Sequence, residues 1–257
     1  MGAGGLVTLA PRLRVIGPGR AGHSLAAALA DVGWEVVGFL GRGDDVADAL
    51  RGTDLLVVAT PDQAIREVVA AVRPDDPRVA PGGVIAHLAG SLGLDTLAPH
   101  RRVAALHPLV ALPTAEIGAR RLRAGPWFSV AGHPIVQRAV SDLGGRWFEV
   151  ADVDRATYHA AAVVASNHLV ALLGQVERIA GSIDVPVEAY LDLARATLDN
   201  VADLGAAVAL TGPAARGDWE TVARHLAALQ PGEREAYRAL AAAARRLVDD
   251  QGLPPDL

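Results

Sequence analysis

Residues 13–22 read LRVIGPGRAG, and this stretch decides the fold. A short apolar run predicts a strand, and the helix-forming residues 21–30 follow it. The glycines between them have the spacing G-x-G-x-x-G, which serves a tight turn, a close approach of backbone to a pyrophosphate, and close packing of helix on strand. Amides at the start of a helix attract anions. The stretch therefore predicts a dinucleotide site formed by Gly17, Pro18, Gly19, Arg20, Ala21 and Gly22.

The tip of the next predicted strand bears on which dinucleotide binds. Residues 34–40 read WEVVGFL, and Gly41, Arg42 and Gly43 follow them. Proteins that bind NAD commonly carry Asp or Glu at this tip, where it holds the ribose 2′-hydroxyl, and we identify none here. An arginine fork suits a 2′-phosphate, so Arg42 predicts NADP(H). The alternative is that Arg42 is only a solvated loop residue.

Composition excludes several kinds of chemistry. The 257 residues suffice for two domains, and the formal net charge of −5 does not suggest a nucleic-acid surface. The chain has no cysteine, which excludes disulfides and thiolate chemistry. All 24 basic residues are arginine, so neither a Schiff base nor a lysine acid is possible. We name no metal site.

The same sequence bears on localisation. The first residues lack the basic and apolar regions of a signal peptide. We find no stretch of about 20 apolar residues that escapes charge, so we expect no membrane span. A cytoplasmic protein is expected.

The first part of the chain alternates between predicted strands and helices. Apolar runs without clear alternation are typical of parallel strands covered on both faces. We expect strands at residues 13–16, 35–40, 55–59, 84–88, 103–106, 127–130 and 146–150. We expect helices at residues 21–30, 46–51, 63–72, 92–97 and 134–143, with Asp44 or Asp45 capping the second of them. The pattern predicts a doubly wound, Rossmann-like parallel sheet over residues 1–151.

From residue 152 the pattern becomes helical. A long helix is expected at residues 155–180, and others at 186–204, 218–229 and 233–250. Gly205 is placed to break the second of these helices, and Thr211-Gly212-Pro213 forms a turn. The sequence therefore predicts an all-α domain over residues 152–257.

Polar residues stand where several predicted strands end. Ligands bind at the carboxyl ends of parallel strands, so Thr60 and Pro61 are expected against the cofactor, although they can equally start a helix. Gly90 and Ser91 follow the next strand, whereas His87 is expected in the core; Ser91 is also a candidate helix cap. His107 ends a further strand, and histidine donates protons near neutral pH. The alternative for His107 is a structural turn.

Two further segments carry candidate substrate residues. Ser166 and Asn167 lie within the long apolar helix, where an asparagine amide needs a partner, either the substrate or a neighbouring helix. Arg216 lies in the loop between two helices and is a candidate to clamp a carboxylate or phosphate. Otherwise Arg216 pairs with Asp218 and stiffens the loop.

Together these segments resemble a known family. Its members are oxidoreductases with a Rossmann-like first domain and a helical domain of unknown function, and they are distant relatives of pyrroline-5-carboxylate reductase, ketopantoate reductase and 6-phosphogluconate dehydrogenase. The resemblance rests on residues 17–22, 60–62, 87–91, 107–109, 166–167 and 210–218. It implies NADP(H), a homodimer formed through the helical domains, and an active site between the domains. The chain lacks the helix lysine that several of these relatives use as an acid.

We therefore expect an NADPH-dependent reductase that acts on the C=O or C=N bond of a small, carboxylated metabolite. In this interpretation Ser166 and Asn167 orient the acceptor, His107 supplies a proton and Arg216 holds an anion. Reduction of ketopantoate is a more specific alternative. A sensor or scaffold that binds NADP(H) without turnover is the other alternative, because fold does not imply function.

Overall fold

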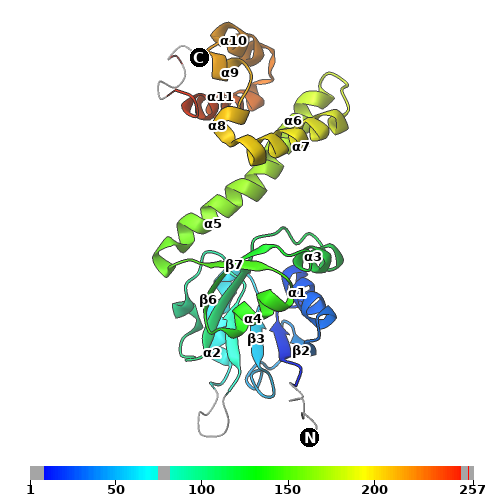
Figure 1. Cartoon of the computed structure of the whole chain (residues 1–257), viewed down its shortest axis with the longest axis vertical. Coiled ribbons are helices and arrows are strands. Elements are labelled where there is room, and N and C mark those ends of the chain that lie inside the picture. Colours follow the sequence, from blue (N-terminus) through cyan, green and yellow to red (C-terminus); the bar gives the residue numbers. More distant parts are fainter. Residues whose placement is uncertain (1–8, 75–81, 250–253, 255–257) are drawn as a thin grey trace, which may run out of the picture. The chain divides into compact units, whose positions relative to one another are not determined.

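The computed structural model describes residues 9–74, 82–249 and 254, and it divides into two compact units (Figure 1). The first unit is Met1–Ser166 and the second is Asn167–Leu257. This division falls inside a helical segment, after the point where the sheet ends. The predicted boundary between residues 151 and 152 marks the end of the sheet instead, and it stays a prediction.

The first unit contains a sheet with the strand order β2-β1-β3-β4-β5-β6-β7. The first five strands are parallel, β6 runs antiparallel to β5, and β7 runs parallel to β6. The predicted doubly wound fold is confirmed. The strands are β1 (Arg12–Ile16), β2 (Glu35–Leu40), β3 (Leu55–Val58), β4 (Val84–His87), β5 (Val103–Pro108), β6 (Trp127–Gly132) and β7 (Arg146–Glu149).

Alternate side chains of the buried strands point to opposite faces of the sheet, so the hydrophobic core forms two layers. Leu13 and Val15 of β1 face the layer that contains α1 (Arg20–Asp31), α3 (Ala115–Leu122) and α4 (Ile135–Asp142). Ile16 faces the other layer, with α2 (Asp62–Ala71) and the short 3-10 helix η1 (Leu94–Leu97). Burial on both faces explains why these strands are apolar throughout.

Helix α3 was not predicted, and a glycine allows its position. The helix packs against α1. A Cβ atom at Gly118 would lie 2.0 Å from Ser24 Oγ, so the two helices are too close for any side chain there. Thr114 caps α3 by accepting a hydrogen bond from the Ile117 amide. The cap and the glycine were both visible in the sequence, but α3 has too few apolar residues to form a clear period.

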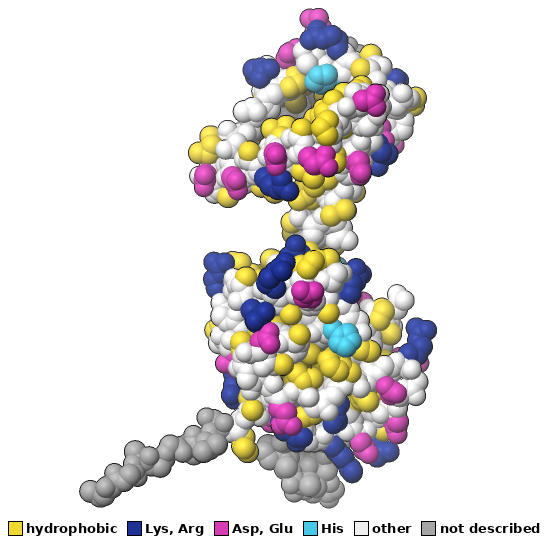
Figure 2. Space-filling view, turned by 90° about the vertical axis from the view of Figure 1, so that its right-hand side faces the viewer, with side chains coloured by type: hydrophobic (Ala, Val, Ile, Leu, Met, Phe, Trp, Pro, Cys, Tyr) yellow, Lys and Arg dark blue, Asp and Glu magenta, His cyan; other side chains and the backbone are white. Residues whose placement is uncertain are grey.

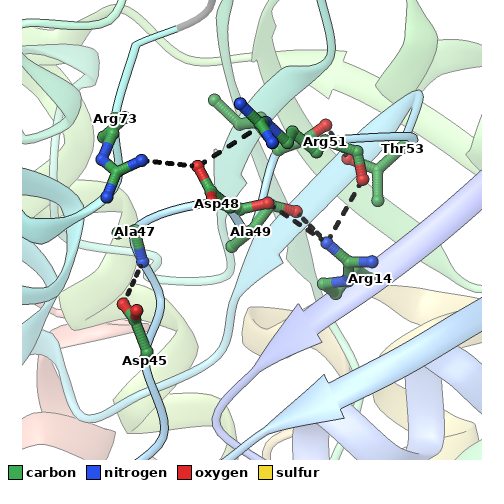
Figure 3. A network of polar contacts seen from close by, with 9 residues as sticks. Arg14, Asp45, Ala47, Asp48, Ala49, Arg51, Thr53 and Arg73 are labelled. Atoms are coloured by element: carbon green, nitrogen blue, oxygen red, sulfur yellow. Dashed lines mark hydrogen bonds and ion pairs between the residues drawn. The ribbon is translucent and has the colours of Figure 1, made fainter.

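The predicted helix at residues 46–51 is wrong. The segment is a series of turns whose carbonyl groups bind a side chain from the sheet (Figure 3). Arg14 Nη1 donates to the Ala49 carbonyl at 2.7 Å and approaches the carbonyls of Asp48 and Arg51. Asp45, expected to cap the helix, instead accepts from the amide of Ala47. These tertiary hydrogen bonds replace the helical ones, which periodicity alone does not anticipate.

The described residues of the second unit form helices and turns and no strand. Helix α5 (Arg155–Val163) still belongs to the first unit, and Figure 1 shows the chain path onward from it. The helices of the second unit are α6 (Leu169–Gly181), α7 (Val187–Leu204), α8 (Ala206–Ala209), α9 (Pro213–Arg216), α10 (Trp219–Ala228) and α11 (Pro231–Arg246). A π-helical segment, Val164–His168, separates α5 from α6 and interrupts the long helix that was predicted. Gly205 ends α7 with a φ of 79°, as expected. The short helices α8 and α9 were missed.

One helical segment, Asp152–Gly181, is long and apolar enough to cross a membrane by length and composition alone. We expected no apolar stretch of about 20 residues without charge. This expectation is wrong, because residues 156–176 contain no Asp, Glu, Lys or Arg. Only 6% of its most apolar window is buried within the chain. Since a single helix of this kind is weak evidence for a membrane span, the observation mainly identifies an apolar surface.

Candidate active site

The glycine loop closes against the end of β3. Gly17 has a φ of 96°, and a Cβ there would lie 2.8 Å from the Ala59 carbonyl and 2.9 Å from the Thr60 nitrogen. A Cβ at Gly22 would lie 2.4 Å from the Gly17 carbonyl oxygen. Gly19 differs, because a Cβ there would meet nothing within 4 Å. The first and third glycines therefore permit packing, while the second borders open space.

The start of α1 fits an anion in that open space. Gly19 is the N-cap and provides no side chain, and the first turn contains no acidic residue. The amides there are consequently left for a ligand, in the field of the helix dipole. Across the loop, Thr60 Oγ1 is buried and has no hydrogen-bond partner among the described residues. These features suit a dinucleotide pyrophosphate beside the loop.

The tip of β2 carries one positively charged and one negatively charged side chain, those of Arg42 and Asp44. Arg42 is exposed and has no ion pair within the described part of the chain. The turn after it brings the Asp44 carboxylate back to the strand, where Oδ2 accepts from the Gly41 amide at 2.7 Å. We predicted no acid at this tip, because Asp44 lies beyond the strand in sequence and was expected to cap the next helix. The tip therefore offers a group suited to a 2′-phosphate and a group suited to a 2′-hydroxyl.

His107 and Tyr158 form a short polar contact at the carboxyl edge of the sheet. His107 lies near the end of β5, and Tyr158 comes from the first turns of α5. The Tyr158 hydroxyl lies 2.6 Å from His107 Nδ1, with the two rings edge to face. His159, the next residue of α5, also packs edge to face on His107, with ring centroids 5.8 Å apart. The first unit therefore holds an aromatic and imidazole cluster.

Gly90 makes room for this cluster. A Cβ at residue 90 would lie 2.7 Å from His159 Cδ2 and 2.9 Å from His107 Nε2. The side of the His107 ring that carries Nε2 therefore faces the backbone at the end of β4, while Nδ1 faces Tyr158. Ser91 does not cap the 3-10 helix, whose N-cap is Gly93; its hydroxyl donates to Asp62 at 3.1 Å.

A buried arginine lies close enough to the cluster to influence His107 and Tyr158. The Arg155 side chain is fully buried, and its Nε donates to Asp152 Oδ1 at 3.0 Å. Its two other guanidinium nitrogens are buried without a hydrogen-bond partner among the described residues. Asp152 also accepts from the Leu94 amide. Burying a guanidinium costs free energy unless its positive charge is balanced by a partner or a ligand. A buried arginine of this kind is therefore a feature expected at a functional site.

Burial favours the neutral form of two histidines, His107 and His87. Burial, followed by the influence of His159, lowers the pKa of His107 to about 4. Burial also lowers the pKa of His87, whose Nε2 lies 3.3 Å from the Gly93 carbonyl. The core position expected for His87 is thus observed. Burial raises the pKa of Tyr158, although Ser129 and the charge of Arg155 oppose it.

Not every candidate residue belongs to this cluster. Ser166 and Asn167 lie on the π-helical turn, a feature that is frequent at functional sites, and Ser166 donates to the Ala162 carbonyl. Arg216 is exposed at the end of α9 in the second unit, next to Asp218, which caps α10. Their predicted roles stay predictions.

Several residues of the cluster were missed from the sequence. Tyr158, Arg155, Asp152 and Ser129 were not predicted as site residues. Ser129 is directly opposite His107 across the β5–β6 ladder. The position of Arg155 after two acids gave no signal, because a helix start with this composition is common. Within the described residues, no group of three or more His, Cys, Asp or Glu could hold a metal ion.

The comparisons with known proteins agree with this architecture. Residues 129–244 match the family model described as "Domain of unknown function (DUF2520)". The family resemblance inferred from the sequence is thereby confirmed. No curated protein matches the sequence.

Three solved structures illustrate the shared fold. The protein BF3122 of Bacteroides fragilis, described as a candidate NADP oxidoreductase, is 19% identical, with a TM-score of 0.76 over 92% of this chain and 98% of that one. The protein TM1727 of Thermotoga maritima is 22% identical, with a TM-score of 0.70 over 93% and 99%. An imine reductase of Myxococcus stipitatus in complex with NADP+ is 21% identical, with a TM-score of 0.60 over 93% of each chain.

We predict that His107 stays neutral in the folded protein until the pH approaches about 4. The unfolded chain binds this proton near its ordinary pKa of 6.5, so the stability that the neutral ring contributes is present above pH 6.5 and is lost as the pH falls towards 4. The slope from this one residue is at most about 1.4 kcal/mol per pH unit. Proton NMR of the imidazole, assigned with His107→Gln, measures the pKa. A His107 resonance that titrates near pH 6.5 would contradict the prediction.

Proposed function

We propose that this protein is an NADPH-dependent reductase that transfers hydride to the C=O or C=N bond of a small, carboxylated metabolite. One observation carries the proposal: the open space at Gly19 and the His107–Tyr158 pair lie at carboxyl ends of parallel strands in one sheet. Ligands bind at this edge in open α/β sheets, at the point where the strand order reverses. Here that point lies between β1 and β3.

The glycine loop and its neighbours would hold the cofactor. The amides after Gly19 suit the pyrophosphate, while Thr60, Pro61, Gly90 and Ser91 line successive strand ends. Arg42, with Arg20 at the loop, favours the 2′-phosphate of NADPH over NADH. When bound, the cofactor supplies the hydride; the protein supplies orientation and electrostatics. The fold shared with an imine reductase that binds NADP+ supports this assignment.

The chain's own residues would complete the reaction. The His107–Tyr158 pair provides the proton that the reduced oxygen or nitrogen needs. Ser166 and Asn167 orient and polarise the acceptor, and Arg216 holds its carboxylate. Ketopantoate reduction is the more specific candidate, and a sensor or scaffold that binds NADP(H) without turnover is the alternative. Polar residues suited to catalysis in both units favour the enzyme.

We further propose a cytoplasmic homodimer that forms through the helical part of the chain. Figure 2 shows hydrophobic side chains on the face of the second unit that is in view. Large apolar residues exposed in this unit include Val170, Ile183, Leu193, Leu198 and Leu204. The segment Asp152–Gly181 is also apolar, and only 6% of its most apolar window is buried. Covering such a surface is a common reason for association.

A methyl group at Gly19 is expected to block the cofactor without disturbing the fold. Because a Cβ there meets only open space, Gly19→Ala should change the free energy of unfolding by less than about 0.5 kcal/mol. The dissociation constant for NADPH should rise at least about tenfold, or 1.4 kcal/mol. Fluorescence titration and urea unfolding measure the two quantities. Gly22→Ala is the matched contrast, because its Cβ clashes with Gly17 and should destabilise the unit by about 1–3 kcal/mol.

Arg42 is expected to determine the preference between the two nicotinamide dinucleotides. The wild type should bind NADPH at least about tenfold more tightly than NADH. Arg42→Ala should remove most of this difference by weakening NADPH alone, since only NADPH carries the 2′-phosphate. Parallel titrations with both dinucleotides provide the internal control. Equal affinities in the wild type would assign the tip of β2 to Asp44 instead.

Turnover is expected with at least one oxo acid or cyclic imine. Ketopantoate and 1-pyrroline-2-carboxylate, each with NADPH, test the two bond types by loss of absorbance at the nicotinamide band. His107→Ala and Asn167→Ala should each lower kcat about 10²-fold or more, with NADPH affinity retained. The proposed roles would be withdrawn if both variants turned over the identified substrate at the wild-type rate.

A further inference from the structure

The His107–Tyr158 contact raises the question of which atom carries the transferred proton. The imidazole has two nitrogens that face different neighbours. Nδ1 lies 2.6 Å from the Tyr158 hydroxyl, and Nε2 lies on the side of the ring that meets the Gly90 backbone. The ring therefore spans the distance between a partly buried hydroxyl and the strand end where the acceptor would lie.

A protonated His107 is not the proton source at neutral pH. The ring is neutral because it is partly buried and surrounded by charges that disfavour an imidazolium overall. The titratable and charged groups that influence it are His159, Arg155, Asp62 and His87. A neutral imidazole gives up its N–H only if the other nitrogen gains a proton at the same time. Only Nδ1 has a suitable donor beside it, the hydroxyl of Tyr158.

Burial raises the pKa of Tyr158, and two neighbours oppose that effect and assist loss of its proton during the transfer. Arg155 is fully buried, and its unpartnered guanidinium nitrogens place a fixed positive charge close enough to stabilise a phenolate. Asp152 holds that guanidinium through Nε alone. Ser129, cross-strand from His107, adds a hydroxyl near the ring. A positive charge placed where negative charge develops is the most effective electrostatic arrangement for such a step.

We propose that Tyr158 and His107 form a two-step proton relay in which His107 acts as a neutral imidazole. As hydride from NADPH reaches the acceptor carbon, the C=O or C=N π bond breaks towards its heteroatom. That heteroatom takes the proton from Nε2 of His107, and Nδ1 takes the proton from the Tyr158 hydroxyl. The products are the alcohol or amine, NADP+, a neutral imidazole with its proton moved to Nδ1, and a phenolate that water reprotonates. This inference rests on the proposed reductase function.

The relay requires a particular tautomer in the resting protein. Nitrogen NMR of labelled protein should show His107 with the proton on Nε2 and with Nδ1 accepting from Tyr158. In Tyr158→Phe this preference should relax towards a mixture of tautomers. A wild-type ring that carries its proton on Nδ1 would overturn the relay. This measurement needs neither cofactor nor substrate, so it distinguishes a failed relay from a failed reductase assignment.

Kinetics provide the second test. With ketopantoate or 1-pyrroline-2-carboxylate as the probe, Tyr158→Phe should lower kcat about 10²-fold or more while the dissociation constant for NADPH changes less than about twofold. Mixtures of H₂O and D₂O should give a curved dependence of kcat in the wild type, because two protons move. Wild-type kcat in a folded Tyr158→Phe variant would overturn the proposal. A linear dependence in the wild type would overturn it even if the variant fails to fold.

A matched control exists in the second unit. The Tyr237 hydroxyl lies 2.6 Å from His225 Nδ1, with the rings edge to face as in the proposed relay. Tyr237→Phe removes the same kind of contact between the helices α10 and α11. It should leave kcat and the His107 tautomer unchanged.

Discussion

The fold depends on the close approach of the Gly17 backbone to the peptide between Ala59 and Thr60. This contact joins the end of β1 to the end of β3, where the strand order reverses, and it leaves no room for a side chain at residue 17. The start of α1 is consequently directed at the same edge of the sheet as the later strand ends. The cofactor loop and the imidazole cluster share an edge because parallel strands all end there.

The sequence was sufficient where local pattern and tertiary environment agree. All seven strands were predicted close to their observed bounds, because burial on both faces makes them continuously apolar. The prediction failed at residues 46–51, where Arg14 binds carbonyl groups that a helix would have used. It also failed at α3, whose packing depends on a glycine opposite Ser24 rather than on a broad apolar face.

Some residues of the candidate site could also be predicted from the sequence, and others could not. The glycine loop, Arg42 and His107 were identified because each stands at a predictable place relative to a strand. Tyr158 was not identified, because its importance comes from a contact with His107, 51 positions away in the chain. Arg155 was not identified, because its ion pair with Asp152 resembles an ordinary helix start. Asp44 was misassigned for a related reason: a turn returns its carboxylate to the tip of β2, and one-dimensional spacing does not contain that return.

Gly90 has a consequence for how such a site can diversify. Two imidazole rings occupy the volume that any side chain at this position would need, so the floor of the site consists of main chain. Main-chain atoms are the same in every sequence, so a point substitution does not change their chemistry. A side chain at residue 90 would displace both rings, so proteins that share this arrangement are expected to differ in substrate through substitutions at other positions.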